Sequence, residues 1–124
     1  MVLPLTFYGN PVLREKGAAM ESVTPELEEF IENMFETMEE YRGIGLAAQQ
    51  VGRAIQLTVI DIRAAENRPS TLEIDGETAD PNSLMPLVLI NPEVTPLNDP
   101  VSGPEGCLSF PEIYGDVTRP EQVR

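Results

Sequence analysis

The chain has 124 residues, which fits one domain that buries roughly two thirds of its unfolded surface. A hydrophobic content of 41% argues against disorder, and a formal net charge of −13 argues against nucleic acid as a partner, because its phosphates are bound by clustered Lys and Arg. No apolar stretch approaches the ~20 residues that cross a bilayer, so we expect no membrane partner.

The first residues, 1 to 6, lack the basic start and apolar run of a signal peptide. The single cysteine cannot form an internal disulfide, so nothing implies an oxidising compartment. We therefore expect a cytoplasmic protein.

An irregular arm is predicted over residues 1–22, followed by an amphipathic helix. Thr24 is its predicted N-cap, Pro25 occupies the first helical position, and Gly43 is predicted to end the helix at the C′ position. Apolar residues recur at steps of three and four, which indicates one face packed on a core: Leu27, Phe30, Ile31, Met34, Met38 and Tyr41.

Short strands are predicted to follow the helix. Residues 56–62 are β-branched and apolar, which indicates a strand buried on both faces. Residues 64–86 are a polar insertion in which Leu72–Ile74, followed by Asp75-Gly76, predicts a small hairpin.

Residues 87–90 predict another apolar strand, which Asn91-Pro92 ends. Prolines recur from 92 to 104 and restrict any strand there to an edge, and residues 113–117 predict a last strand. The fold class is therefore α+β, with the helix leading and the strands following.

The first segment with possible chemistry covers residues 43 to 50, which read Gly-Ile-Gly-Leu-Ala-Ala-Gln-Gln. It follows a helix and lacks a third glycine, so it does not fit a dinucleotide-binding loop. A helix cap and tight turn would explain the first glycine. Small residues permit close backbone approach, and an amide side chain such as that of Gln50 can stabilise an oxyanion.

The second segment, residues 105 to 109, reads Glu-Gly-Cys-Leu-Ser. A lone cysteine is most often a small buried hydrophobe. A cysteine protease needs a histidine base, and the chain contains no histidine, so thiol catalysis of that type is excluded. Cys107 can still be a thiolate metal ligand, but one ligand does not hold a metal.

Together the two segments resemble the first two motifs of the peptide deformylase family, the metal-dependent hydrolases that remove formyl groups from the N-terminal methionine of newly made proteins. The resemblance spans most of residues 4–120. It implies a single peptide deformylase-like domain over 1–124, with an N-terminal amphipathic helix packed on antiparallel β-sheets.

The resemblance also implies roles at the reacting centre. Cys107 would bind a divalent metal, typically iron(II), with zinc or nickel as substitutes. Gln50 would donate its side-chain amide to the formyl oxyanion, helped by the backbone N–H of Leu108.

Other residues would bind the substrate or support the site. Ile44, Gly45 and Gly106 would line an edge where an N-formylmethionyl peptide or nascent chain pairs like an added strand. Glu105 would pair with Arg119, although a solvated contact explains such a pair as well.

The family's third motif, a His-Glu-x-x-His helix with two metal ligands and the general base, is absent because the chain has no histidine. We therefore expect no appreciable deformylase activity from these 124 residues alone, and the metal can be absent too. In the family the missing helix packs between the sheets, so we expect apolar faces around Leu57 and Leu87, covered by a missing C-terminal segment or by self-association.

Three interpretations remain open at the level of sequence. The chain is the N-terminal portion of a deformylase, or a catalytically dead relative that binds peptides or a partner. Otherwise it is an unrelated interaction domain or a relative with other metal ligands, for which Glu105 and Asp116 are candidates, although such carboxylates are usually only solvated.

Overall fold

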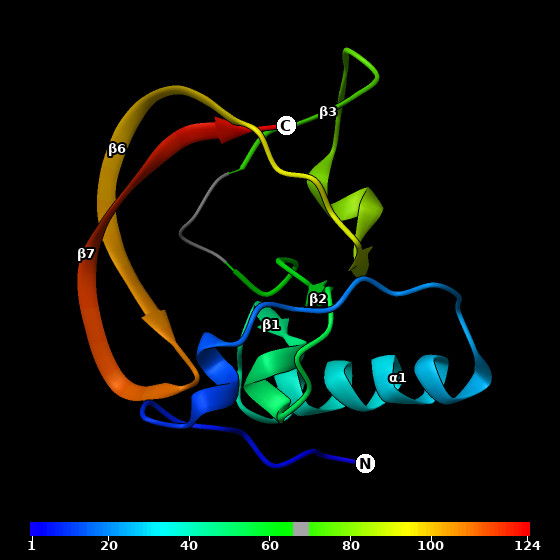
Figure 1. Cartoon of the computed structure of the whole chain (residues 1–124). Coiled ribbons are helices and arrows are strands. Elements are labelled where there is room, and N and C mark those ends of the chain that lie inside the picture. The colour runs from blue at the N-terminus through cyan, green and yellow to red at the C-terminus, as the bar shows by residue number, and fades with distance from the viewer. Residues whose placement is uncertain (66–69) are drawn as a thin grey trace.

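The computed structural model describes residues 1–65 and 70–124 and has an α+β architecture (Figure 1). Helix α1 (Pro25–Glu40) packs on a three-stranded antiparallel sheet in the order β1-β2-β5. The sheet consists of β1 (Gly45–Ala47), β2 (Leu57–Ile60) and β5 (Leu87–Ile90). Two hairpins and three short 3-10 helices complete the described chain: β3 (Leu72–Ile74) with β4 (Glu77–Ala79), β6 (Pro96–Cys107) with β7 (Phe110–Val123), η1 (Pro11–Arg14), η2 (Ala48–Val51) and η3 (Pro81–Leu84).

The start of α1 confirms the predicted cap. The Thr24 side chain accepts a hydrogen bond from the backbone N–H of Leu27 at 3.1 Å, and Pro25 is the first helical residue. The apolar face of the helix packs against the sheet, and its buried residues form one cluster with those of the strands and η2: Leu27, Met34, Met38, Leu46, Ala48, Leu57 and Val59.

The end of α1 corrects the predicted role of Gly43. The residue in the left-handed conformation is Arg42, with φ 57°, and the N–H of Gly43 bonds the carbonyl of Met38 at 2.9 Å. The N–H of Arg42 bonds the carbonyl of Glu39 at 3.1 Å. This pair of bonds is a Schellman motif with Arg42 at C′ and Gly43 one position later. Gly43 is therefore not the terminating residue.

Strand β2 is the centre of the three-stranded sheet, and only one of its faces is fully buried. Leu57 and Val59 are buried on the α1 side, whereas Thr58 and Ile60 are half-buried. The predicted burial on both faces is therefore wrong for half of the strand. The expected exposure around Leu57 is also wrong, because this side chain joins the core cluster, while Leu87 is half-buried.

The predicted hairpin in the polar insertion is confirmed. Strands β3 and β4 pair antiparallel, and the two residues between them, Asp75 and Gly76, have φ values of 52° and 82°. Positive φ at both central residues is what a type I′ turn needs, and Asp-Gly supplies it. Within the insertion of 64–86, residues 66–69 lie outside the described residues.

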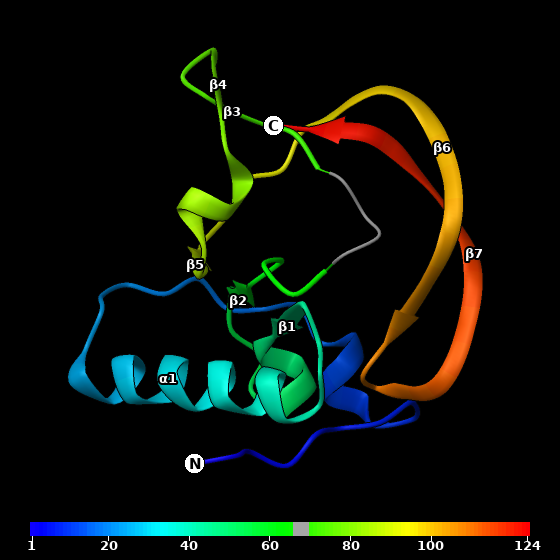
Figure 2. The same cartoon turned by 180° about the vertical axis from the view of Figure 1, so that it is seen from behind.

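The hairpin of β6 and β7 forms a long arc whose turn lies beside the N-terminal arm, while its other end, at the C-terminus, lies well away from α1 (Figures 1 and 2). Its second strand runs from Phe110 to Val123 and is much longer than the predicted 113–117. The proline-rich segment forms β6, which in the described chain pairs with β7 alone, so the predicted edge position is confirmed. Cys107 pairs with Phe110, which places Leu108 and Ser109 in the turn.

The N-terminal arm ties distant parts of the chain together. The N–H of Thr6 bonds the carbonyl of Gln50 at 2.8 Å, and the N–H of Tyr8 bonds the carbonyl of Ser109 at 3.0 Å. The arm thereby links η2 to the turn of the β6–β7 hairpin. Asn91, with φ 51°, holds the far end of the arm by bonding both the N–H and the carbonyl of Met20. None of the helices in the described chain is long and apolar enough to span a membrane.

Candidate functional site

Gln50 and Cys107 meet at the place where η2 approaches the end of β6. The side-chain nitrogen Nε2 of Gln50 lies 3.5 Å from the Cys107 sulfur, at hydrogen-bond distance for a sulfur acceptor. The other end of the same amide is fixed, because Oε1 accepts a bond from the N–H of Ala47 at 2.9 Å. Gln50 therefore holds its N–H donors toward the thiol. The thiol side chain is exposed, so a ligand can reach it.

The turn after Cys107 is fixed by packing as well as by hydrogen bonds. Leu108 is half-buried and lies against Gly43, where a Cβ atom would come within 2.8 Å of Leu108 Cδ1. The rings of Tyr8 and Phe110 contact each other beside the turn, with centroids 4.8 Å apart and planes tilted by 36°. The Leu108 backbone N–H thus sits next to the thiol in a constrained turn.

The predicted ion pair behind the thiol is confirmed. Arg119 Nε lies 2.9 Å from both carboxylate oxygens of Glu105. The hydrogen bond and charge of Glu105 raise the pKa of Arg119 above its ordinary value. Both side chains are partly exposed, and such pairs add little to stability. The contact links β6, which ends at Cys107, to β7.

Gly45 presents its backbone at an open edge of the three-stranded sheet. The carbonyl of Ile44 accepts a hydrogen bond from the N–H of Asp61 at 2.9 Å, so the backbone polar groups of Ile44 point toward the β2 side. Bonding directions alternate along an antiparallel pair, and the N–H and carbonyl of Gly45 therefore point away from β2. Among the described residues, β1 has no neighbour on that side.

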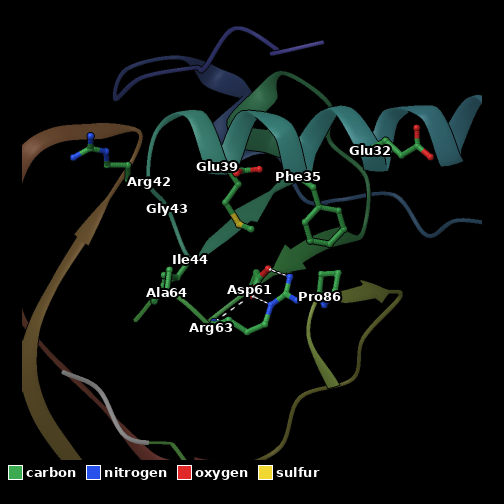
Figure 3. A pocket seen from close by; sticks show the side chains of 11 residues that line it. Glu32, Phe35, Glu39, Arg42, Gly43, Ile44, Asp61, Arg63, Ala64 and Pro86 are labelled. Atoms are coloured by element: carbon green, nitrogen blue, oxygen red, sulfur yellow. Dashed lines mark hydrogen bonds and ion pairs between the residues drawn. The ribbon is translucent and has the colours of Figure 1, made fainter. Parts of the chain in front are cut away.

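A cavity of about 900 Å³ borders Ile44 but not the thiol (Figure 3). Phe35 of α1 and Pro86 before β5 form apolar walls, and Asp61 and Arg63 form a charged part of the rim. Arg63 donates two hydrogen bonds to the Asp61 carboxylate, from Nε to Oδ1 at 2.9 Å and from Nη2 to Oδ2 at 2.6 Å. This hydrogen bonding lowers the pKa of Asp61. Cys107 and Gln50 are not among the residues that line the cavity.

The comparisons with known proteins agree with this arrangement. The family model for polypeptide deformylase matches residues 2–124. The chain is 45% identical to the peptide deformylase of Opitutus terrae and 44% identical to that of Methylacidiphilum infernorum, over 99% and 100% of its own length. It spans 65% of the length of each of these two curated relatives.

Solved structures give the same result. A peptide deformylase from Synechococcus elongatus, in complex with actinonin, superposes with a TM-score of 0.79 at 39% identity and covers 98% of this chain and 56% of its own. The enzyme from Thermotoga maritima gives a TM-score of 0.78 at 31% identity, covering 99% and 71%.

The chain belongs to the polypeptide deformylase family. Members of this family are metal-dependent and act on nascent N-formylmethionyl peptides. The family assignment and the α+β deformylase fold, both predicted from the two motifs, are confirmed.

The donor set of this chain does not by itself fit a metal ion. Across residues 1–65 and 70–124, no three His, Cys, Asp or Glu side chains gather closely enough to hold one. Metal catalysis by deformylases requires several protein ligands around an open position, and the described site contributes one sulfur, that of Cys107. The structure brings Cys107 and Gln50 together and places Gly45 on a separate edge strand.

Sequence reasoning missed three features of the site. Arg42 takes the left-handed position at the end of α1, Tyr114 lies over Gly106, and the buried Ser109 hydroxyl has no hydrogen-bond partner among the described residues. The glycine before Cys107 is a sequence signal for the contact with Tyr114, because aromatic rings often pack across a glycine that faces them on the neighbouring strand. The sequence holds no local signal for the others.

Proposed function

We propose that a polypeptide carrying these residues is a peptide deformylase, which hydrolyses the N-formyl group from the N-terminal methionine of newly made proteins. The observation that carries this proposal is the 3.5 Å approach of Gln50 Nε2 to the Cys107 sulfur, which joins the two family motifs at one exposed point. Family membership supports it independently.

Gln50 and Leu108 supply the electrostatic part of the proposed reaction. Attack on a formyl carbonyl places negative charge on its oxygen, and preorganised N–H donors stabilise that charge. Gln50 is preorganised because its side-chain oxygen Oε1 accepts a hydrogen bond from the backbone N–H of Ala47. Its Nε2 therefore cannot rotate away without losing that bond. The N–H of Leu108 is the second proposed donor, held in the turn by the contact of its side chain with Gly43.

The substrate chain is proposed to bind as an added strand. The outward N–H and carbonyl of Gly45 offer the hydrogen bonds of one residue pair, and extended peptides use such edges. Ile44 is 41% exposed beside this edge and can contact an apolar side chain. Gly106, exposed on β6 before the thiol, is the proposed contact on the opposite side.

The remaining assignments follow from the family. We propose that Cys107 is one metal ligand, with iron(II) as the metal and zinc or nickel as substitutes, in a polypeptide that also contains a His-Glu-x-x-His motif. We further propose that residues 1–124 belong to one domain and that the protein works in the cytoplasm on nascent chains. Because these 124 residues contain no histidine, we expect no appreciable activity from them alone.

The test compares the 124-residue protein with the same protein joined to a family member's segment that carries the His-Glu-x-x-His motif. Formate release from a formyl-methionyl peptide is measured for both. We expect activity only from the joined protein. A folded joined protein without activity, or a metal-dependent rate from the 124 residues alone, would contradict the proposal.

A further inference from the structure

Tyr114 lies directly over Gly106, the residue before the thiol. The two residues face each other across β6 and β7. A Cβ atom on Gly106 would come within 2.6 Å of Tyr114 Cε1 and 2.9 Å of Cδ1, so the ring occupies the space that any other residue's side chain would need. The ring is otherwise open to solvent, with 77% of Tyr114 exposed.

The strand ladder is interrupted between this pair and the thiol. Gly106 pairs with Tyr114, but Cys107 pairs with Phe110, and the intervening residues 111–113 of β7 have no partner on β6. Such a bulge leaves residues without ladder hydrogen bonds and bends the strand. Glu112 within it has a φ of 62°, which confirms the irregular path. The ladder therefore does not by itself fix the backbone around Cys107.

Gly106 adds conformational freedom at this interruption, because glycine restricts its own backbone less than any other residue. An aromatic ring that packs across a strand glycine supplies the side-chain contacts that the glycine itself lacks. Tyr114 makes such a contact at Gly106, one residue before Cys107 and two before Leu108.

We infer that Tyr114 is a positioning residue, whose ring against Gly106 fixes the backbone that carries the Cys107 thiol and the Leu108 N–H. The catalytic roles of the Cys107 thiol and the Leu108 N–H rest on the proposed function, whereas the ordering of the backbone by Tyr114 does not. The high exposure of Tyr114 shows that it buries little of its ring, so its effect is local to the bulge and separate from the core.

The experiment uses ¹⁵N NMR relaxation and nuclear Overhauser effects on the 124-residue protein. In the wild type we expect contacts between the Tyr114 ring protons and the Gly106 Hα protons, with order parameters for Cys107 and Leu108 near the ~0.85 of rigid backbone. In Tyr114→Ala we expect both order parameters to fall toward ~0.6, the boundary of flexible backbone, while those of α1 stay unchanged. Tyr114→Phe keeps the ring and should retain the wild-type values.

Ile113→Ala is the matched control, because Ile113 is 62% exposed in the same bulge and has no partner on β6. It should leave Cys107 and Leu108 ordered. Where Tyr114→Ala does not fold, Tyr114→Thr replaces it, because a β-branched side chain keeps strand propensity but cannot extend over Gly106.

Absent ring contacts, unchanged order parameters in the folded Ala or Thr variant, no rescue by Phe, or equal loosening by Ile113→Ala would each overturn the inference. A loss of order spread equally over α1 would also overturn it, since that is the result of a general structural role. Failure of the deformylase assay leaves these measurements untouched, so the inference and the proposed function fail separately.

Discussion

Gly43 and Leu108 are packing partners from the two family motifs. Gly43 follows α1, Leu108 sits in the turn after the thiol, and the Leu108 Cδ1 atom lies 2.8 Å from the place where a Cβ on Gly43 would be. A Cβ there would also come within 3.4 Å of Met38. The missing side chain of Gly43 thus lets the hairpin turn dock on the end of the helix.

Gly43→Ala is expected to lower the free energy of unfolding by about 1–3 kcal/mol, the usual cost of adding a methyl group to a filled site. The added Cβ must displace Leu108, because no space remains between them. Urea denaturation followed by circular dichroism measures the change.

Gly45→Ala is the matched control, since its Cβ would meet nothing closer than the Val59 carbonyl at 3.9 Å. Equal stabilities for the Gly43 and Gly45 variants would show that the contact with Leu108 is not tight in solution.

Arg42→Gly is expected to stabilise the protein by up to about 1 kcal/mol. Arg42 has a φ of 57°, and residues with a Cβ adopt the left-handed conformation at a cost that glycine avoids. The shift of the urea midpoint measures the gain. Tyr41→Gly, one position earlier at φ −93°, should destabilise instead, and a gain in that variant would contradict the explanation.

Asp61→Asn is expected to lower the free energy of unfolding by less than about 1 kcal/mol at neutral pH, because the Arg63 side chain of the pair is largely exposed. Arg63 depresses the pKa of Asp61 in the folded protein below its ordinary 3.8, first through the side-chain hydrogen bond. The unfolded chain therefore takes up the proton first as pH falls, so the contribution exists above pH 3.8 and is lost below it.

The measurement for this pair is urea denaturation of the wild type and Asp61→Asn between pH 7 and about pH 2. The difference between the two proteins should stay constant down to about pH 5 and shrink below the ordinary carboxyl pKa. A difference that grows as the solution becomes more acidic would reverse the sign of the linkage and exclude the ion pair as its cause.

Gln50→Leu, in the protein joined to a His-Glu-x-x-His segment, is expected to lower kcat by about 10²–10³-fold, the usual effect of removing one oxyanion donor. Leucine has a similar size but donates no hydrogen bond. Gln49→Leu is the control, because the Gln49 amide points to the carbonyl of Glu15 at 3.4 Å and not to the thiol. Similar losses of kcat for both variants would mean that the Gln50 donor has no special role.

Local signals were sufficient to predict most elements of the fold. The Thr24 cap, the apolar spacing along α1 and the Asp75-Gly76 turn each depend on interactions within a few residues, and the structure confirms them. The exception is Tyr41, the last residue of the predicted apolar face, which is 45% exposed. The proximity of Gln50 to Cys107 followed from the resemblance to the family, because neither residue carries a local sign of the other.

Tertiary packing explains what could not be predicted. Gly43 was assigned to the helix end because glycine favours that position, but the space it leaves is filled by Leu108 from far along the chain. An exposed apolar face was expected around Leu57, but this side chain lies in the core, and the direction in which it points is set by the register of β2 against β1 and β5. The length of β7 is set by its pairing with β6. The prolines of β6 weaken the local sequence signal for a strand there, so this pairing could not be predicted.

The central claim is that the Cys107 sulfur and the Gln50 amide face one ligand position. Cobalt(II) added to the joined protein tests it most directly, because a thiolate ligand gives a sulfur-to-cobalt charge-transfer absorption band. We expect this band in the wild type and in Gln50→Leu, its loss in Cys107→Ser, and full deformylase activity in the wild type alone. A band that persists in Cys107→Ser, or full activity in Gln50→Leu, would contradict the claim.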